Sequence, residues 1–182
     1  QTPLMTIICV SCLLGLIIYL GSVASFSISP MTTGLRSAVS ATHSSSILGG
    51  TQRAVTFDHL LVNIGEDFNP ETGTFRCRLP GAYYFSFTVG KFPKKMLSIM
   101  LVKNGMEVGE VRAMVFNEDM SRRREMQSQS LLLSLKRGDS VWLYSQQDDG
   151  YAVYSNQGRY TTFSGFLVYP DGESMNRDRT YP

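Results

Sequence analysis

The sequence predicts an all-β protein built from antiparallel strands. Large apolar residues recur at every second position from Arg53 onward, and Tyr83, Phe85, Phe87 and Val89 are the clearest example. The apolar runs are short, and residues that favour turns separate them. Because short strands at regular spacing pack as facing sheets, we expect an antiparallel sandwich or barrel.

The expected strands follow one another at short intervals along the chain. Most are rich in β-branched or aromatic residues, which suit a pleated and half-buried surface. They are residues 55–63, 74–78, 82–89, 97–103, 108–116, 128–135, 141–146 and 162–169. The turn residues between them are Asn69-Pro70, Thr72-Gly73, Pro80-Gly81, Asn104-Gly105, Arg137-Gly138-Asp139, Asp149-Gly150 and Pro170-Asp171-Gly172.

The composition fits one globular domain that does not act on nucleic acid. With 182 residues, the chain has the length of a single domain. Hydrophobic residues make up 43% and charged residues 18%, which is too apolar for a disordered chain. The net charge of +2 lacks the strong basic excess of most nucleic-acid-binding domains.

Residues 1–24 are predicted to form an apolar N-terminal signal segment. No charged side chain precedes Arg36, and residues 5–20 are almost entirely apolar. Small residues follow at 21–25, as in the cleavage region of a secretory signal peptide. An uncleaved membrane anchor is the alternative, since about 20 apolar residues can span a bilayer. Both interpretations place the rest of the chain outside the cell.

Residues 25–52 are expected to hold a first strand, at 25–29, followed by a flexible loop. The stretch 30–52 is rich in Ser, Thr and Gly and shows no periodicity. The globular core then covers residues 53–171. A polar tail is expected at 172–182.

Cys77 is the only cysteine beyond the signal segment, so no disulfide is expected within the domain. Its alternation with Phe75 favours a buried, inert thiol. The flanking Arg76 and Arg78 favour a reactive thiol instead, because nearby positive charge lowers a thiol pKa.

A long pattern of aromatic residues surrounds the strand at 82–89. Its members are Phe57, Asn63, Phe68, Phe75, Gly81, Tyr83, Phe85 and Phe87, and their intervals resemble the signature of the globular C1q domain family. The segment 162–170, which contains Phe163 and Gly165, is similar to the closing strand of that family. Other stretches resemble the C1q/tumour-necrosis-factor-related proteins and the cerebellins. We expect all these residues to form the framework of the fold.

The resemblance implies a ten-stranded antiparallel jelly-roll sandwich that packs as a trimer. Proteins of this family are secreted ligands or recognition molecules, not enzymes. The signature occurs once, and no collagen-like repeat is present, so assembly is expected through the globular domain. The implied partners are further copies of the chain, paralogues in mixed trimers, and a cell-surface receptor.

Candidate partner-binding residues lie in two predicted loops. Arg122, Arg123 and Arg124 would suit an acidic partner or a sulfated sugar, although such a run is often only a solvated loop. Tyrosine is enriched in interfaces, and the second loop contains three. The candidates there are Tyr151, Tyr154 and Asn156, together with Tyr160.

Asp148 and Asp149 are candidate calcium ligands, because some C1q-like trimers bind calcium near this loop. Ca²⁺ takes about six to eight oxygen ligands, to which symmetry-related aspartates would contribute. Against calcium, the positions where some relatives carry acidic residues are here Gln157, Arg159 and Tyr160. No other cofactor is expected.

The sequence contains few residues or motifs that would support an enzymatic function. His43 and His59 are the only histidines, and no nucleophile elbow, P-loop or zinc-protease motif occurs. The leading hypothesis is a secreted trimeric ligand that signals through a cell-surface receptor. The alternatives are a pattern-recognition protein of innate immunity, which binds microbial or damaged surfaces, and a structural matrix protein.

Overall fold

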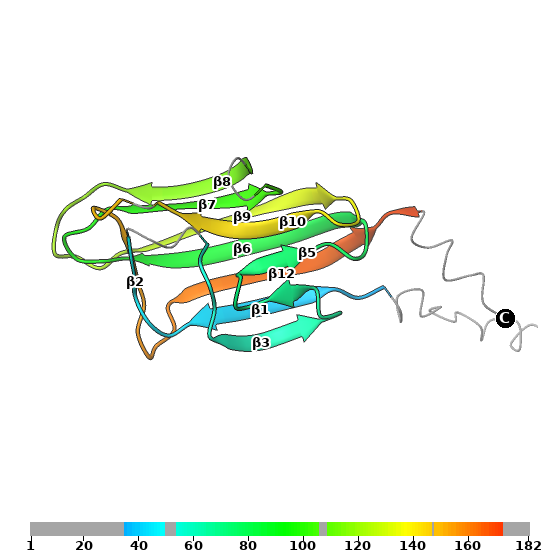
Figure 1. Ribbon diagram of the computed structural model, residues 1–182, viewed down its shortest axis with the longest axis horizontal. Coiled ribbons are helices and arrows are strands. Elements are labelled where there is room, and N and C mark those ends of the chain that lie inside the picture. Colours follow the sequence, from blue (N-terminus) through cyan, green and yellow to red (C-terminus); the bar gives the residue numbers. More distant parts are fainter. Residues whose placement is uncertain (1–34, 50–53, 106–108, 147, 173–182) are drawn as a thin grey trace, which may run out of the picture. The chain divides into compact units, whose positions relative to one another are not determined.

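The computed structural model describes residues 35–49, 54–105, 109–146 and 148–172, which form an antiparallel β-sandwich (Figure 1). The strands are β1 (Ala38–His43), β2 (Ile47–Leu48), β3 (His59–Ile64), β4 (Phe68–Asn69), β5 (Thr74–Arg76), β6 (Gly81–Lys91), β7 (Leu97–Lys103), β8 (Glu110–Asn117), β9 (Met126–Leu135), β10 (Ser140–Ser145), β11 (Ala152–Tyr154) and β12 (Thr161–Pro170). The predicted all-β, antiparallel fold is confirmed.

Two sheets form the layers of the sandwich. The larger sheet has the strand order β2-β11-β6-β12-β1-β3, and β9 pairs with the other edge of β6. The smaller sheet has the order β4-β5-β10-β7-β8. The long strand β6 is central to the larger sheet, because it pairs with β9, β12 and β11.

Aromatic rings from both sheets meet in the core. Phe75 of β5 contacts Tyr83 and Phe85 of β6, with ring centroids 5.3 and 5.4 Å apart. Phe163 of β12 continues the cluster, at 5.7 Å from Phe85 and 5.6 Å from Phe68. All five rings are buried, and each contributes about 1.5–3 kcal/mol through its buried area.

Two further framework residues show why the signature contains polar or small positions. Asn63 closes the turn before β4: its Nδ2 donates to the Phe68 carbonyl at 2.9 Å, and its Oδ1 accepts from the Phe68 N–H at 3.3 Å. Gly165 lies against the Phe85 ring so closely that a Cβ atom would overlap it. Phe57 packs edge-on to Phe68 at 5.7 Å. Gly81 begins β6.

The prediction of a flexible loop at 30–52 is wrong for its described part. Residues 38–43 form β1, which lies between β12 and β3 in the larger sheet. Only Val39 and Ala41 point into the core, and neither is large. The alternate positions Ser40 and Thr42 face similar hydroxyl residues of β12, so the strand has no apolar alternation strong enough to detect.

Other strand boundaries also differ from the sequence prediction. Val55 and Phe57 are buried but precede β3, which begins at His59. Residues 152–154 form β11 inside the segment predicted as a long loop. The described residues contain twelve strands, whereas the resemblance implied ten, and two of the twelve are only two residues long.

Some sequence predictions concern residues beyond the described ranges. These are the signal segment at 1–24, the first strand at 25–29 and the polar tail from 173. In the part of the chain that the structure covers, no helix is long and apolar enough to cross a membrane.

Candidate functional site

The loop between β8 and β9 is attached to the sandwich by Lys91. This side chain is fully buried at the end of β6. Its ammonium donates to the carbonyls of Ser121 at 3.2 Å and Arg123 at 3.4 Å. Its backbone N–H donates to the Glu125 carbonyl at 2.8 Å. A buried cation therefore fixes the backbone that displays the arginine run.

Arg124 packs on the ring of Tyr154, the last residue of β11. Its guanidinium carbon lies 4.8 Å from the ring centroid, a cation–π contact. Tyr160 stacks on the same ring at 6.0 Å and 19°. Asn156 Nδ2 donates to the Tyr154 hydroxyl at 2.9 Å. Residues from the two predicted loops thus meet, and we call Lys91, Arg122–Arg124, Tyr154, Asn156 and Tyr160 the apical cluster.

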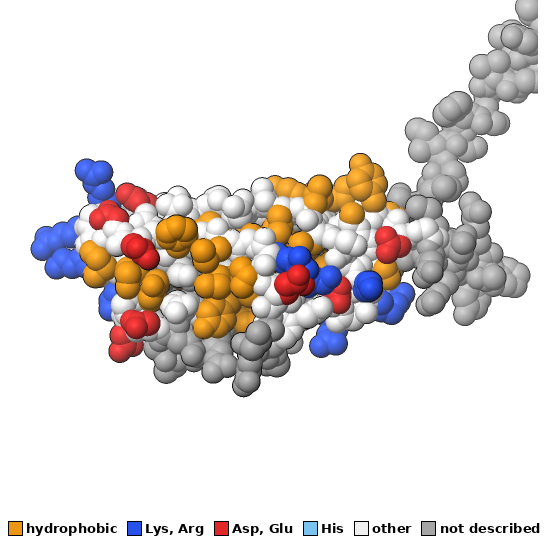
Figure 2. All heavy atoms as spheres, turned by 90° about the horizontal axis from the view of Figure 1, so that it is seen from above, with side chains coloured by type: hydrophobic (Ala, Val, Ile, Leu, Met, Phe, Trp, Pro, Cys, Tyr) orange, Lys and Arg blue, Asp and Glu red, His pale blue; other side chains and the backbone are white. Residues whose placement is uncertain are grey.

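Arg122 and Arg123 are exposed at the tip of this cluster. Neither guanidinium forms an ion pair or hydrogen bond with any other residue that the structure describes. Basic side chains project from this end of the molecule in the view from the β8 side, at the left of Figure 2. Of the three arginines, these two are free to meet a partner.

Tyr151 and the two aspartates lie outside the apical cluster. Tyr151 forms an isolated bridge with Met96. Asp148 Oδ1 accepts from the Gly150 N–H at 2.6 Å, and the Asp149 carbonyl accepts from Lys95 Nζ at 2.5 Å. The described residues contain no group of three or more His, Cys, Asp or Glu that would hold a metal ion. Asp148 therefore stabilises a turn through its side chain.

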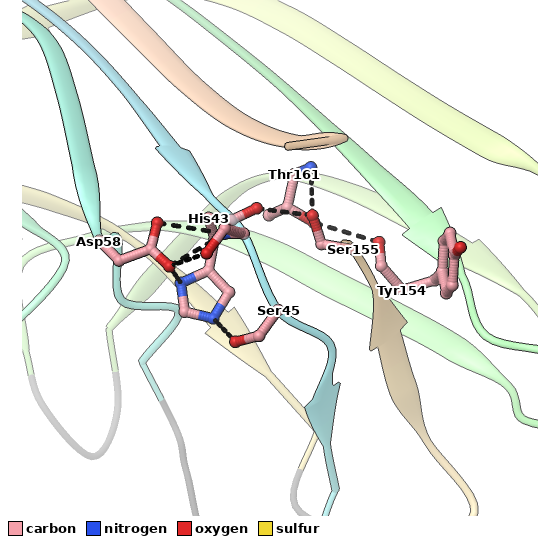
Figure 3. A network of polar contacts seen from close by, with 7 residues as sticks. His43, Ser45, Asp58, Tyr154, Ser155 and Thr161 are labelled. Carbon is pink, nitrogen blue, oxygen red and sulfur yellow. Dashed lines mark hydrogen bonds and ion pairs between the residues drawn. The ribbon is translucent and has the colours of Figure 1, made fainter. Parts of the chain in front are cut away.

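A polar network beneath the cluster connects β1 with the segment before β12 (Figure 3). Ser155 Oγ donates to the His43 carbonyl at 2.6 Å and accepts from the Thr161 N–H at 3.3 Å. Thr161 Oγ1 donates to the Tyr154 carbonyl at 3.4 Å. These bonds hold the backbone on both sides of the Tyr154–Tyr160 stack.

Figure 3 shows a serine, a histidine and an aspartate side by side, the residue types of a hydrolytic triad. Their distances do not fit such a triad. Ser45 Oγ lies 3.0 Å from His43 Nε2, yet His43 Nδ1 is 4.0 Å from Asp58 Oδ2, beyond hydrogen-bond reach. The Asp58 carboxylate accepts instead from the Ser44 N–H at 3.1 Å and from the Ser44 hydroxyl. Partial burial acts to raise the Asp58 pKa, but these hydrogen bonds and His43 hold it below its ordinary value. We assign the group a structural role.

Cys77 is buried, as its strand alternation predicts, and is 1% exposed. Burial raises the pKa of its thiol to about 11. Its Sγ donates to the Leu79 carbonyl at 3.1 Å. A protonated, inaccessible thiol is unreactive, so the reactive alternative is excluded.

The outer face of the larger sheet carries a row of apolar side chains. The strand register aligns Phe166 with Tyr84 and Tyr84 with Leu132, and it aligns Ala38 with both Phe166 and Ile64. Phe166 is 47% exposed and Leu132 is 64% exposed. The rings of Phe166 and Tyr84 are 5.5 Å apart. We call these five residues the apolar row.

Hydroxyl side chains fill the next two rows on this face. One row aligns Ser40, Ser164, Ser86 and Ser130, and the other aligns Thr42, Thr162, Thr88 and Ser128. Ser40 and Ser164 are hydrogen-bonded at 3.1 Å, and Thr88 and Ser128 at 2.8 Å. Small polar side chains leave this part of the sheet flat, so a second protein surface can approach it closely.

Comparison with known proteins matches this architecture to one family. Residues 38–168 match the C1q domain. Caprin-2 of Danio rerio is 36% identical over 140 residues, which cover 76% of this chain and 15% of that protein. Complement C1q tumor necrosis factor-related protein 1 of Mus musculus is 38% identical over 122 residues, or 65% of this chain and 41% of the relative. The matched region therefore spans less than half of each relative.

Solved structures show the same fold at lower identity. The globular domain of zebrafish complement 1qA protein has a TM-score of 0.60 and 24% identity, covering 74% of this chain and 99% of that domain. Murine APRIL at pH 8.0 has a TM-score of 0.54 and 11% identity, covering 73% of this chain and 99% of its own. At such identities the likeness establishes the fold alone.

Proposed function

Because the chain belongs to the C1q domain family, we propose that it is a secreted ligand that assembles as a trimer and binds a cell-surface receptor. The family supports a non-enzymatic role in binding. In this proposal the larger sheet provides the trimer contact. The apical cluster provides the surface for the receptor.

The apolar row is the observation that carries the proposal. Soluble monomers rarely expose contiguous apolar surface without an interaction that covers it. Phe166 and Tyr84 form such a surface with Ile64 and Leu132, and it runs across the strands of a regular sheet rather than lying in a loop. Three copies related by a threefold rotation would bury these rows in a closed ring of heterologous contacts.

The apical cluster would remain accessible in such a trimer. The apolar row crosses β6 at Tyr84, near the beginning of the strand, whereas Lys91 ends the strand, so the cluster lies farther along the strands than the row. The exposed guanidinium groups of Arg122 and Arg123 would then project from the tip of each copy. Such groups suit an acidic receptor surface.

Sedimentation of the full chain tests the trimer with two matched variants. Phe166→Glu places a charge in the apolar row, whereas Phe116→Glu places one at an exposed phenylalanine on β8, in the other sheet. We expect the wild type and Phe116→Glu to sediment as trimers at micromolar concentration and Phe166→Glu as a monomer. A monomeric wild type, or a trimeric Phe166→Glu, would refute the proposed contact.

Pattern recognition is the alternative, since a tip with exposed arginines also suits anionic microbial or damaged surfaces. Binding of the wild-type protein to cultured cells distinguishes the two. We expect saturable binding that mild protease treatment of the cells abolishes and that Arg122→Glu/Arg123→Glu weakens at least tenfold. Equal binding to protease-treated cells or to isolated microbial polysaccharide would favour pattern recognition instead.

A further inference from the structure

A second group of arginines lies at the opposite end of the sandwich from the apical cluster. Here, beside the beginning of β6, a depression of about 260 Å³ opens at the surface. Charged side chains of both signs also gather on the half of the molecule away from the apical tip (Figure 2). The depression, which we call the basal pocket, is lined by Glu66, Asp67, Arg76, Cys77, Arg78, Arg137 and Gly138.

Backbone hydrogen bonds bring three chain segments together around Cys77. The Cys77 N–H donates to the Asp139 carbonyl and its carbonyl accepts from the Gly138 N–H, both at 2.7 Å. The Arg76 N–H donates to the Asp67 carbonyl, also at 2.7 Å. The β9–β10 turn and the β3–β4 loop therefore lie on two sides of the end of β5. The three arginines reach the same depression from this fixed backbone.

Arg78 is already oriented. Its Nε donates to Asp67 Oδ1 at 3.0 Å, and its Nη2 donates to the Arg36 carbonyl at 3.1 Å. The Asp67 side chain is only 4% exposed, so this ion pair is partly shielded from water. Its formation offsets the charge of the buried carboxylate.

Arg76 and Arg137 are exposed. In the described ranges of the chain, neither side chain makes a hydrogen bond or an ion pair. The remaining acid at the pocket is Glu66, which is exposed. The lining thus has three guanidinium groups against two carboxylates, one of which is already paired.

We propose that the basal pocket binds a tetrahedral oxyanion, the sulfate or phosphate ester group of an extracellular polymer. A guanidinium group donates two parallel hydrogen bonds to such an anion, which makes arginine its preferred ligand. Arg76 and Arg137 provide the unpaired donors, whereas the charge of the fixed Arg78 is already offset by Asp67. This inference rests on the proposed secretion of the chain but on neither the trimer nor the apical cluster.

The first test measures anion binding to the full chain at constant ionic strength. Inorganic sulfate and inorganic phosphate are titrated separately, and arginine Nε–H resonances are followed by NMR. We expect saturable shifts of the Arg76, Arg78 and Arg137 signals with at least one anion. Linear shifts of all arginine signals, without saturation, would overturn the proposal because they would reflect general screening.

Two variants that each lose two positive charges distinguish anion binding at the basal pocket from general electrostatic attraction to the protein. Arg76→Gln/Arg137→Gln removes two exposed charges whose side chains form no hydrogen bond or ion pair with the described residues, so the fold should remain intact. Lys94→Gln/Arg159→Gln removes two exposed charges at the opposite end. We expect at least tenfold weaker anion binding in the first and less than a twofold change in the second. Equal losses would overturn the proposal.

The source of the anion is resolved with immobilised oligosaccharides that carry sulfate esters, phosphate esters or neither. The wild type should elute from one charged column at higher salt than Arg76→Gln/Arg137→Gln, and the neutral column should retain neither. Equal elution of both proteins from both charged columns would refute a polymer ligand. Sedimentation of the pocket variant should match the wild type, so a failure here leaves the proposed trimer unaffected.

Discussion

The apical cluster and the basal pocket each contain three arginines, but they are arranged differently. At the apical end, the residues of the run 122–124 are adjacent in sequence, and only the last packs on a ring, that of Tyr154. At the basal end, Arg76, Arg78 and Arg137 come from two separate segments and line one depression. The apical arginines, which are neighbours in sequence, therefore lie side by side on an exposed tip. The basal arginines, which come from separate segments, line one pocket.

The two ends also differ in how the fold supports them. The apical loop is held by a buried ammonium that donates to the carbonyls of Ser121 and Arg123. The basal pocket is held by an ion pair that lies over a glycine, Gly65, whose φ is +90°. We therefore expect the basal end to lose stability when a side chain is added at Gly65. The apical end should lose stability when the Lys91 ammonium donor is removed.

The largest expected effect is that of Gly65→Ala. A Cβ atom here would lie 2.7 Å from Asp67 Oδ2 and would overlap Arg78 Nη2. The left-handed backbone costs an L-residue about 1–2 kcal/mol, and displacing a charge-assisted hydrogen bond adds about 1.5–3 kcal/mol. We expect urea denaturation to show a loss of about 3 kcal/mol in the free energy of unfolding.

Gly138→Ala is the matched control for this prediction. Gly138 has nearly the same backbone conformation, with a φ of +89°, but an added Cβ would meet no atom within 4 Å. Only the backbone cost of about 1–2 kcal/mol should remain. Equal losses of stability in the two variants would mean that a Cβ atom at Gly65 does not disturb the Arg78–Asp67 ion pair. The basal end would then not be especially sensitive to added volume.

The next effect in size is that of Lys91→Met at the apical end. Methionine fills a similar volume but leaves the Ser121 and Arg123 carbonyls without the ammonium donor. The cost should be about 1.5–3 kcal/mol, a typical penalty for a lost hydrogen bond to a charged group. Hydrogen exchange of the amides in 119–125 should accelerate by about tenfold, because the loop can open to reach water.

Lys94→Met makes the same chemical change at an exposed lysine on the neighbouring turn. It should leave the exchange rates within about twofold of the wild type, since exposed substitutions have small effects. Unchanged exchange in Lys91→Met would mean that the loop is held by its other bonds. One of these is Asn117 Nδ2, which donates to Glu125 Oε2 at 2.6 Å.

The framework was predictable from sequence because its residues are large and alternate strictly. Phe75, Tyr83, Phe85 and Phe87 are all fully buried, and their spacing is visible without a structure. Strand β1 was missed because it buries only small side chains and presents hydroxyl groups outward. When neighbouring strands provide the large apolar side chains of the core, a strand such as β1 shows little alternation of apolar and polar residues in its own sequence.

The sites were less predictable, because they depend on contacts between distant segments. Adjacency pointed to Arg122, Arg123 and Arg124 but did not reveal that Arg124 is engaged with Tyr154. Nothing local marks Lys91 as buried. The basal pocket joins the β9–β10 turn to the end of β5, and these segments meet through the β5–β10 strand pairing and the hydrogen bonds around Cys77.

The smallest expected effect tests whether the three apical arginines are equivalent. Arg124→Ala should cost about 0.5–1 kcal/mol of stability, the usual value of an exposed cation–π contact. Arg122→Ala should change stability by less than about 0.5 kcal/mol, because its side chain forms no hydrogen bond, ion pair or cation–π contact with the described residues. A double-mutant cycle with Tyr154→Leu isolates the pair, since the coupling should vanish for Arg122 and persist for Arg124. Equal coupling for both would mean that the run acts as one diffuse charge. In that case Arg124 would not be the residue that stabilises the loop while Arg122 and Arg123 remain free for a partner.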